Sequence, residues 1–113
     1  MFKKENRLTK QKDFDNVFQN GFSSFNKILG VKVAANHLDT NRFGVIVSTK
    51  ISKKATDRNK LKRKLREILK TYSEDMEAGW DIAVVALPPA RDKDFWELKN
   101  ICGKHFRKLK LIS

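Results

Sequence analysis

The chain has 113 residues, 40% of them hydrophobic, which suffices for a single domain with a buried core spanning 1–113. Its 25 Lys and Arg residues outnumber its 13 Asp and Glu residues, and the formal net charge of +12 favours a polyanionic partner. A nucleic acid is the first candidate and an anionic membrane surface the second. The apolar runs are too short to cross a bilayer and the first residues lack a signal-peptide core, so we expect a cytoplasmic protein.

The cysteine and histidine content argues against a disulfide or a zinc site. Cys102 is the only cysteine and falls on an apolar stripe, so it is expected to fill space in the core. His37 and His105 are the only histidines, too few for a set of soft ligands. We therefore expect no metal site on the protein and no organic cofactor. Any metal required would be a hard cation, held largely by the nucleic acid.

The first half of the chain predicts one helix and two strands. Thr9 is placed to cap a short helix that reaches Asn20, and a glycine follows it. Apolar and polar residues alternate over 28–35 and again over 43–51, which predicts two strands. The polar stretch 36–41 forms the turn between them.

The second half predicts a basic helix, a strand and a last helix. The basic helix begins at Thr56 or Asp57 and fades near residue 73. Residues 80–87 form the most hydrophobic strand, which we expect at the centre of the sheet, with Trp80 and Trp96 packed inside. The last helix is amphipathic and begins at residue 92 or 94.

This order of elements, αββαβα, predicts an α+β fold of the α/β sandwich type. A small mixed sheet would carry helices on one face, because two strands before the basic helix and one after it need a shared cover. The first helix is placed to wall the other face and to turn it into a groove.

The basic helix is the most informative segment. Ten basic residues lie between Lys50 and Lys70, against Asp57 and Glu67 as the only acids. An apolar stripe at helical spacing shows that the segment is a folded, docked helix, and the basic side chains fill a neighbouring arc. Such a rigid cationic surface suits phosphates, although a merely solvated face is the alternative. The stripe consists of Leu61, Leu65, Ile68, Leu69 and Tyr72, and the arc of Arg58, Asn59, Lys62, Arg63, Arg66 and Lys70.

Phe14 and Phe18 lie four residues apart on the first helix and project together. Two adjacent rings can stack on unpaired bases, but an aromatic pair at this spacing also occurs in ordinary cores. Both readings stay open at the level of sequence.

Acidic residues do not indicate a nuclease active site. The carboxylate pairs, such as Asp13 with Asp15 and Asp92 with Asp94, fall at helix ends or in turns, where acids complement the helix dipole. None comes with a histidine or lysine at working distance. We therefore expect no catalytic residue on the protein, and a protein nuclease is the least favoured class.

Four blocks of the chain, in the right order, resemble the protein subunit of bacterial ribonuclease P. They are Arg-Phe-Gly-Val-Ile-Val-Ser-Thr-Lys at 42–50, Arg-Asn-Lys-Leu-Lys-Arg-Lys-Leu-Arg-Glu at 58–67, the Leu-x(5)-Phe-x(3)-Phe helix at 8–18, and the strand ending before Pro-Ala at 84–90. The closing helix fits as well. The resemblance covers nearly the whole chain.

This resemblance implies a function in which the protein is not the catalyst. In that family the protein binds the catalytic RNA and helps it grip precursor tRNA, whose 5′ leader the RNA removes with Mg²⁺. The expected partners are therefore the catalytic RNA and precursor tRNA, with the protein as one monomer in a 1:1 ribonucleoprotein and no membrane contact. The implied fold resembles ribosomal protein S5 domain 2, with a left-handed crossover around the basic helix. A stand-alone RNA or DNA binder is the alternative.

The resemblance also implies two sets of site residues. The basic helix and the loop before it would face the RNA subunit through Lys53, Lys54, Arg58, Asn59, Lys60, Lys62, Arg63, Arg66 and Lys70. The groove beside the first helix would hold the leader through Phe14, Phe18, Lys32, Ser48 and Lys50.

Two positions depart from the family pattern. Lys60 replaces the second Arg of an Arg-Asn-Arg motif, which keeps the charge but loses the planar guanidinium fork. Lys32 stands where some relatives place an aromatic residue in the groove, which favours a phosphate contact over base stacking there.

Overall fold

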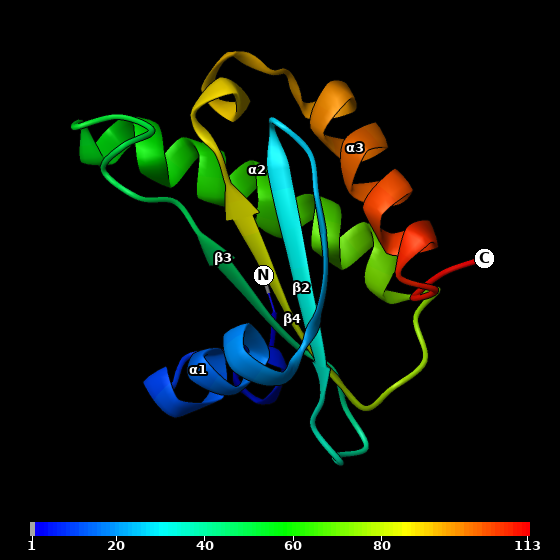
Figure 1. Cartoon of the computed structure of the whole chain (residues 1–113). Helices are drawn as coiled ribbons and strands as arrows, with labels where there is room; N and C mark the ends of the chain where they lie inside the picture. Colours follow the sequence, from blue (N-terminus) through cyan, green and yellow to red (C-terminus); the bar gives the residue numbers. More distant parts are fainter. Residues whose placement is uncertain (1) are drawn as a thin grey trace.

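A four-stranded sheet with helices on both sides forms the protein (Figure 1). The structure is a computed structural model that describes residues 2–113. Two short 3-10 turns, η1 and η2, precede the first and the last helix. The elements are η1 Lys4–Asn6, α1 Gln11–Asn20, β1 Phe22–Phe25, β2 Leu29–Ala35, β3 Arg42–Ile46, α2 Ala55–Ser73, β4 Trp80–Ala86, η2 Pro88–Asp92 and α3 Phe95–Lys108.

The strands lie in the order β1-β2-β4-β3, which makes the sheet mixed. β2 is antiparallel to both β1 and β4, whereas β3 and β4 are parallel and joined through α2. With β3 and β4 pointing upward in Figure 1, β4 lies to the right of β3 and α2 lies behind the sheet. The crossover is therefore left-handed, against the general preference, as the resemblance implies. The predicted central position of the 80–87 strand is confirmed.

The main hydrophobic core lies between the sheet and the helices α2 and α3. The apolar stripe of α2 is buried as predicted, including Leu65 and Ile68, which have no exposed surface. It belongs to one core cluster with apolar side chains of β2 and β4, such as Val31 and Val84. Cys102 of α3 is also fully buried, which confirms its expected place in the core.

The other face of the sheet is covered at one end only, by α1. Val17 of α1 packs with Leu8, Ala34 of β2 and Ala83 of β4 in a second, smaller core. Figure 1 shows α1 against one end of the strands, on the side opposite α2. The rest of this face is left without a helix, as the element order predicts.

The structure contains one strand that the sequence pattern does not predict. β1 lengthens the order to αβββαβα. Its sequence, Phe-Ser-Ser-Phe, lacks the alternation of apolar and polar residues that is typical of a half-buried strand, so the sequence does not predict a strand here. Tertiary contacts stabilise it instead: it pairs with β2, and the buried hydroxyl of Ser24 lies 2.7 Å from Nδ1 of His105 on α3.

Several element boundaries differ from the predictions. The N-cap of α1 is Lys10 rather than Thr9, and no side chain caps this helix. β3 ends at Ile46 rather than residue 51, because the chain turns where the N–H groups of Lys50 and Ile51 donate to Ser48. α2 begins at Ala55, one residue before the predicted cap, because the carboxylate of Asp57 accepts the hydroxyl of Ser52 rather than capping the helix. Within residues 2–113, none of the helices combines the length and the apolar character needed to span a bilayer.

The start of α3 agrees with the sequence. Asp94 accepts the N–H of Glu97, and the Glu97 carboxylate lies 3.5 Å from the N–H of Asp94, which forms a capping box. Asp94 rather than Asp92 is therefore the cap.

Candidate nucleic-acid interface

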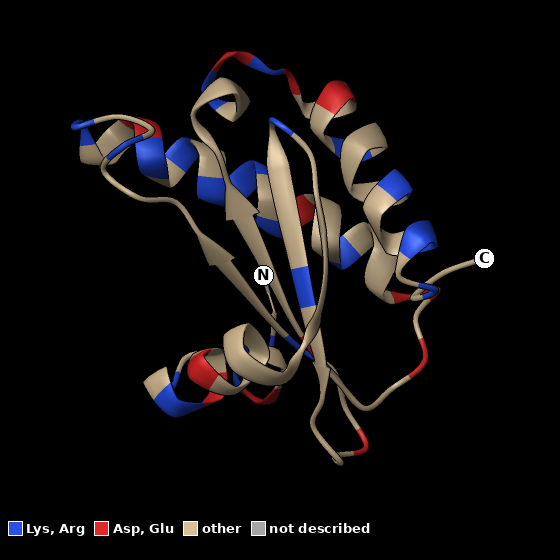
Figure 2. Cartoon of the chain, viewed as in Figure 1, with Lys and Arg blue, Asp and Glu red and all other residues tan. Residues whose placement is uncertain are grey.

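The basic side chains of α2 form no ion pair with an acid in the described part of the chain. The ion pairs among residues 2–113 involve Arg42, Arg91 and Lys93, and none includes a basic residue of α2. Figure 2 shows Lys and Arg repeating along the whole of this helix, with few acids beside them. Their charges are thus available to an external polyanion. Most of the predicted set is exposed, namely Lys53, Lys54, Asn59, Lys60, Arg63, Arg66 and Lys70.

The predicted set divides between two flanks of α2. Arg66 lies on the flank toward the outer edge of β3, where it lines a pocket with Phe14 of α1. Lys60 and Lys64 lie on the opposite flank and line a smaller cleft that includes Arg91. At 100° per residue, Lys62 falls on the Arg66 flank. The structure therefore places Lys60 on a different flank of the helix from Arg66. Lys60 thus differs from the family's Arg-Asn-Arg motif in residue type and lies apart from Arg66 in space.

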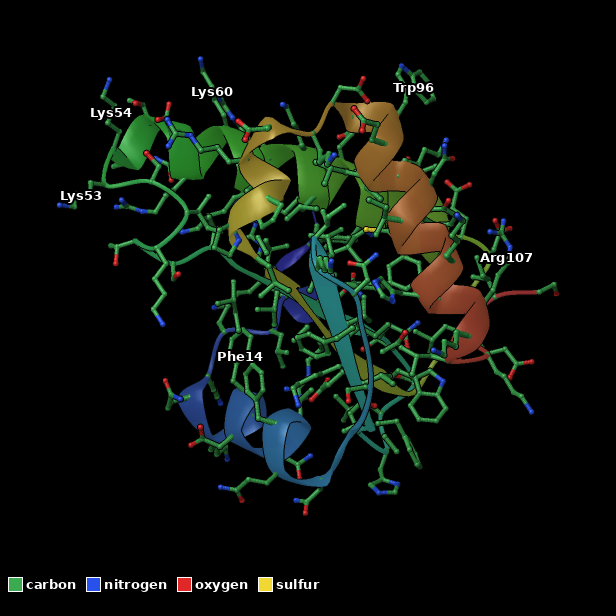
Figure 3. The ribbon with its side chains drawn as sticks, turned by 45° about the horizontal axis from the view of Figure 1, so that its top comes forward. Phe14, Lys53, Lys54, Lys60, Trp96 and Arg107 are labelled. Carbon is green, nitrogen blue, oxygen red and sulfur yellow. The ribbon has the colours of Figure 1, made fainter. Side chains whose placement is uncertain are left out.

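The start of α2 is tied to the loop that precedes it. The guanidinium of Arg58 donates to the carbonyl of Ser52 at 2.9 Å, so this half-buried side chain fixes the loop in addition to carrying charge. Lys53 and Lys54 project away from the molecule at this end of the helix (Figure 3). Ser48 and Lys50 are exposed in the turn after β3, so they lie beyond the strand end where the sequence places them.

α1 lies against one end of the free face of the sheet, where the sequence predicts a groove. Phe14 points from α1 toward the sheet (Figure 3). Its ring rests directly on Gly44 of β3, since a Cβ at that glycine would lie 2.6 Å from the ring. Phe18, one turn later, is 39% exposed. Phe14 is therefore largely a packing residue, whereas Phe18 presents an open ring.

Lys32 of β2 joins two aromatic rings on this free face. Its Nζ lies 5.3 Å from the ring centroid of Phe18 and 5.6 Å from that of Phe25 on β1. Phe25 is 46% exposed, and its ring covers Gly30, where a Cβ would come within 2.0 Å of it. Sequence reasoning misses Phe25 because β1 itself is not predicted.

An ionic cluster fixes α1 against the sheet. The guanidinium of Arg42 donates to both carboxylate oxygens of the buried Asp81, at 2.8 and 2.7 Å, and to Asp13 of α1 at 3.1 Å. Asn36 donates to the same Asp81 carboxylate. The hydrogen bonding of Arg42 to Asp81, in which the guanidinium donates, raises the pKa of Arg42 above its ordinary value. Asp81 is a charged residue inside the apolar 80–87 run, and a buried charge requires a partner, so the sequence offers a signal for this ion pair.

A pocket of about 400 Å³ opens beside Phe14 of α1, at the outer edge of β3. The pocket lies between Phe14 of α1 and Arg66 of α2. The helix predicted to contact the leader and the helix predicted to bind the RNA subunit therefore border the same pocket. Its lining residues are Phe2, Arg7, Leu8, Thr9, Phe14, Phe43, Gly44, Val45, Arg66 and Leu69.

Other candidate reactive groups are accounted for by packing. Asp13 is engaged with Arg42, and burial raises the pKa of the Cys102 thiol to about 12, so this thiol is protonated at neutral pH. Among residues 2–113, no three His, Cys, Asp or Glu side chains gather closely enough to hold a metal ion. Trp96 does not pack as expected: it is 67% exposed on α3, and the ammonium of Lys99 lies 5.3 Å from its ring (Figure 3).

Comparison with known proteins identifies the family. Residues 2–110 match the family model for ribonuclease P. The ribonuclease P protein component of Clostridium botulinum strain 657 is 37% identical over 98 residues, covering 86% of this chain and 87% of the relative. That of Alkaliphilus metalliredigens is 32% identical over 108 residues, covering 96% of each.

Solved structures agree with the sequence relatives. The ribonuclease P protein of Staphylococcus aureus superposes with a TM-score of 0.87 at 31% identity, covering 96% of this chain and 98% of its own. The protein from Thermotoga maritima superposes with a TM-score of 0.78 at 33% identity, covering 89% and 96%. With its mixed sheet, its left-handed crossover and its free basic helix, the chain belongs to the ribonuclease P protein family.

Proposed function

We propose that the protein binds the catalytic RNA of ribonuclease P through α2 and the 5′ leader of precursor tRNA through the groove beside α1. The RNA carries out the Mg²⁺-dependent hydrolysis and holds the metal ions, and the protein contributes no catalytic group. It acts in the cytoplasm as a single copy in a 1:1 ribonucleoprotein.

The observation that carries this proposal is the absence of ion pairs on the basic side chains of α2 among residues 2–113. Cationic side chains that neutralise phosphates release condensed counterions, so affinity falls as salt rises. About six such contacts give a log-log slope of roughly −4 to −5. Family membership names the polyanion: a component of ribonuclease P has an RNA partner.

Reconstitution tests the proposal against a stand-alone nucleic-acid binder. The purified protein is expected to leave precursor tRNA uncut by itself and to lower the Mg²⁺ concentration that a cognate ribonuclease P RNA requires for cleavage. A stand-alone binder would bind RNA without changing that requirement. Cleavage by the protein alone, lost on changing a carboxylate, would instead identify a protein nuclease.

Phe18→Ala tests the leader groove. It is expected to weaken binding of precursor tRNA to the holoenzyme by about 1 to 3 kcal/mol, because one stacking surface for an unpaired base is lost. Binding of mature tRNA, which has no leader, should not change. Affinities of both RNAs for wild-type and variant holoenzymes give the measurement.

Phe22→Ala is the matched control, because Phe22 is an exposed aromatic residue (72%) of β1. It pairs with Val33 of the main core, so its ring lies on the face of the sheet opposite to Phe18. This variant should bind both RNAs normally. Equal weakening of precursor and mature tRNA by Phe18→Ala, with an unchanged melting temperature, would exclude a leader contact at this ring.

A further inference from the structure

The outer side of α3 carries a second cationic surface, on residues that belong neither to α2 nor to the surface beside α1. At 100° per residue, its exposed residues share one arc of about 80°. We name this set the α3 face, and it consists of Trp96, Asn100, Lys104 and Arg107. Figure 3 shows Trp96 near one end of the helix and Arg107 near the other, both projecting away from the sheet.

The positive charges of the α3 face are not neutralised within the protein. Among residues 2–113, the ion pairs include neither Lys104 nor Arg107. Glu97, the one acid of α3, is engaged with Lys93 at 3.7 Å. Figure 2 shows basic positions repeating along this helix. The face therefore offers free donors to a phosphate backbone.

Trp96 adds an aromatic surface to these charges. Its side chain is 67% exposed, which is unusual for so large an apolar group. Phe95 meets the indole edge-on, with ring centroids 5.4 Å apart and an angle of 89° between the planes. The ammonium of Lys99 lies 5.3 Å from the ring centroid. A base stacked on this indole would therefore bring its phosphate toward a positive charge.

The α3 face lies apart from the ring that is expected to contact the leader. α3 shares the main core with α2 and packs against β1 and β2. α1, which carries Phe18, packs on the other side of the same sheet. An RNA strand on the α3 face would therefore not compete with a strand at Phe18.

The composition of the α3 face favours RNA over a membrane surface. A helix that lies on a bilayer inserts an apolar face. The apolar side of α3 is used by the core, since Leu98, Cys102 and Phe106 have no exposed surface. A single open indole among cations is instead the combination with which proteins bind single-stranded nucleic acids.

We propose that the α3 face binds a single-stranded RNA segment other than the 5′ leader, with one base stacked on Trp96 and phosphates on Lys99, Lys104 and Arg107. The helix rises by about 16 Å from Trp96 to Arg107, so the contact extends beyond one nucleotide. Binding is tolerant of sequence, because every base has a face that can stack. The protein can thus hold a further RNA segment while α2 and the surface beside α1 are occupied.

The fluorescence of Trp96 tests the site in the full chain. The chain has two tryptophans, and Trp80→Phe leaves Trp96 as the only one. Oligouridylate is expected to quench the Trp96 emission with a dissociation constant of about 1 to 100 μM, because a stacked base contacts the indole. Anisotropy of a labelled oligouridylate measures total binding in the same samples. Unchanged Trp96 emission while the labelled strand is bound would overturn the proposal.

Two double variants of equal charge separate the α3 face from general attraction to a basic protein. Lys104→Gln with Arg107→Gln should reduce the salt slope of the Trp96 titration by about 1.4, since each single-strand phosphate contact contributes about 0.7. Lys3→Gln with Lys4→Gln removes the same charge beside β3, whereas α3 packs near the opposite edge of the sheet. This control should leave the slope unchanged. All four side chains are exposed, so both variants should fold, and equal slopes would overturn the proposal.

Two further arms distinguish other occupants of the face. Phe18→Ala should leave the Trp96 titration unchanged, and loss of quenching in this variant would place the strand at Phe18 and overturn the proposal. Phosphatidylglycerol vesicles should not shift the Trp96 emission to shorter wavelength. Such a shift, without quenching by oligouridylate, would assign the face to a membrane surface and overturn the proposal. That result leaves the reconstitution experiment with the RNA subunit unaffected.

Discussion

Arg42 determines how α1 is held, because it satisfies a buried carboxylate on β4 and an acid on α1 at the same time. Asp81 is only 2% exposed, so its charge depends on the two hydrogen bonds from Arg42 and the one from Asn36. Asp13 is more exposed and makes one contact. Loss of the arginine therefore leaves an uncompensated buried charge, whereas loss of Asp13 leaves none.

Arg42→Met is expected to lower the free energy of unfolding by about 3 kcal/mol, the cost of leaving a buried carboxylate without its partner. Asp13→Asn, the control, should lower it by less than about 1 kcal/mol, since a partly exposed ion pair contributes little. Urea unfolding monitored by circular dichroism measures both. Similar values for the two variants would show that Asp81 keeps its charge solvated without Arg42.

His105 gives stability a dependence on pH. It is buried between α3 and β1 with Nδ1 on Ser24, and burial lowers its pKa below the ordinary value. Its Nε2 has no hydrogen-bond partner within residues 2–113. A proton is therefore taken up more readily by the unfolded chain than by the folded one in the range just below the unfolded pKa of about 6.5.

The resulting stability is fully present above about pH 6.5 and is lost as pH falls through the folded pKa of His105. The free energy of unfolding should accordingly decrease between about pH 7.5 and pH 5.5. His105→Gln should flatten this decrease, and His37→Gln, a change at an exposed histidine, should retain it. A slope that survives His105→Gln would assign the effect to other groups.

The two flanks of α2 face different parts of the molecule, although both are basic. The flank with Lys62 and Arg66 adjoins β3 and the pocket, and the flank with Lys60 and Lys64 adjoins η2, where Arg91 and Asp92 lie. Only the first is continuous with the α1 side of the protein. We therefore expect RNA phosphates to concentrate on the first flank.

Paired variants of equal charge test this difference. Lys62→Gln with Arg66→Gln should reduce the salt slope of RNA-subunit binding by about 1.5, as expected for two lost phosphate contacts. Lys60→Gln with Lys64→Gln should reduce it by less than about 0.5. Filter binding over a range of salt gives both slopes. Equal reductions would place phosphates on both flanks.

Long periodic elements were predictable from the sequence, and short elements held by tertiary contacts were not. The stripe from Leu61 to Tyr72 and the Asp94–Glu97 capping box specify α2 and α3 locally. β1 has no such local signal, because pairing with β2 and the Ser24–His105 contact stabilise it. The same limit applies to the site: Phe18 was predictable from its helix, but Phe25 depends on β1.

The whole molecule carries more positive charge than its fold can neutralise internally. The formal net charge is +12, and the described ion pairs engage few of the basic residues. Self-repulsion of this excess opposes the compact state, and a bound polyanion relieves it. The left-handed crossover determines where this charge lies, since it places the basic helix α2 together with α3 on one side of the sheet (Figure 2).

Polyuridylate is expected to raise the melting temperature by about 5 °C at low salt, which corresponds to roughly 1 kcal/mol for a domain of this size. Sodium chloride at the same ionic strength should raise it less, because monovalent ions only screen the repulsion. The shift should vanish near 1 M salt, where the Debye length is about 3 Å. Thermal scans by circular dichroism measure the melting temperature in each condition. Equal shifts with polyuridylate and with sodium chloride would exclude a bound polyanion.

Lys32 is also expected to affect self-association of the free protein. Its ammonium lies over the partly exposed rings of Phe18 and Phe25. Without this charge, the two rings would form one exposed apolar patch, which favours association. A charge at the centre of such a patch disfavours self-association, because two copies would have to dehydrate and oppose two ammonium groups. We therefore expect Lys32 to limit self-association of the free protein through this aromatic surface.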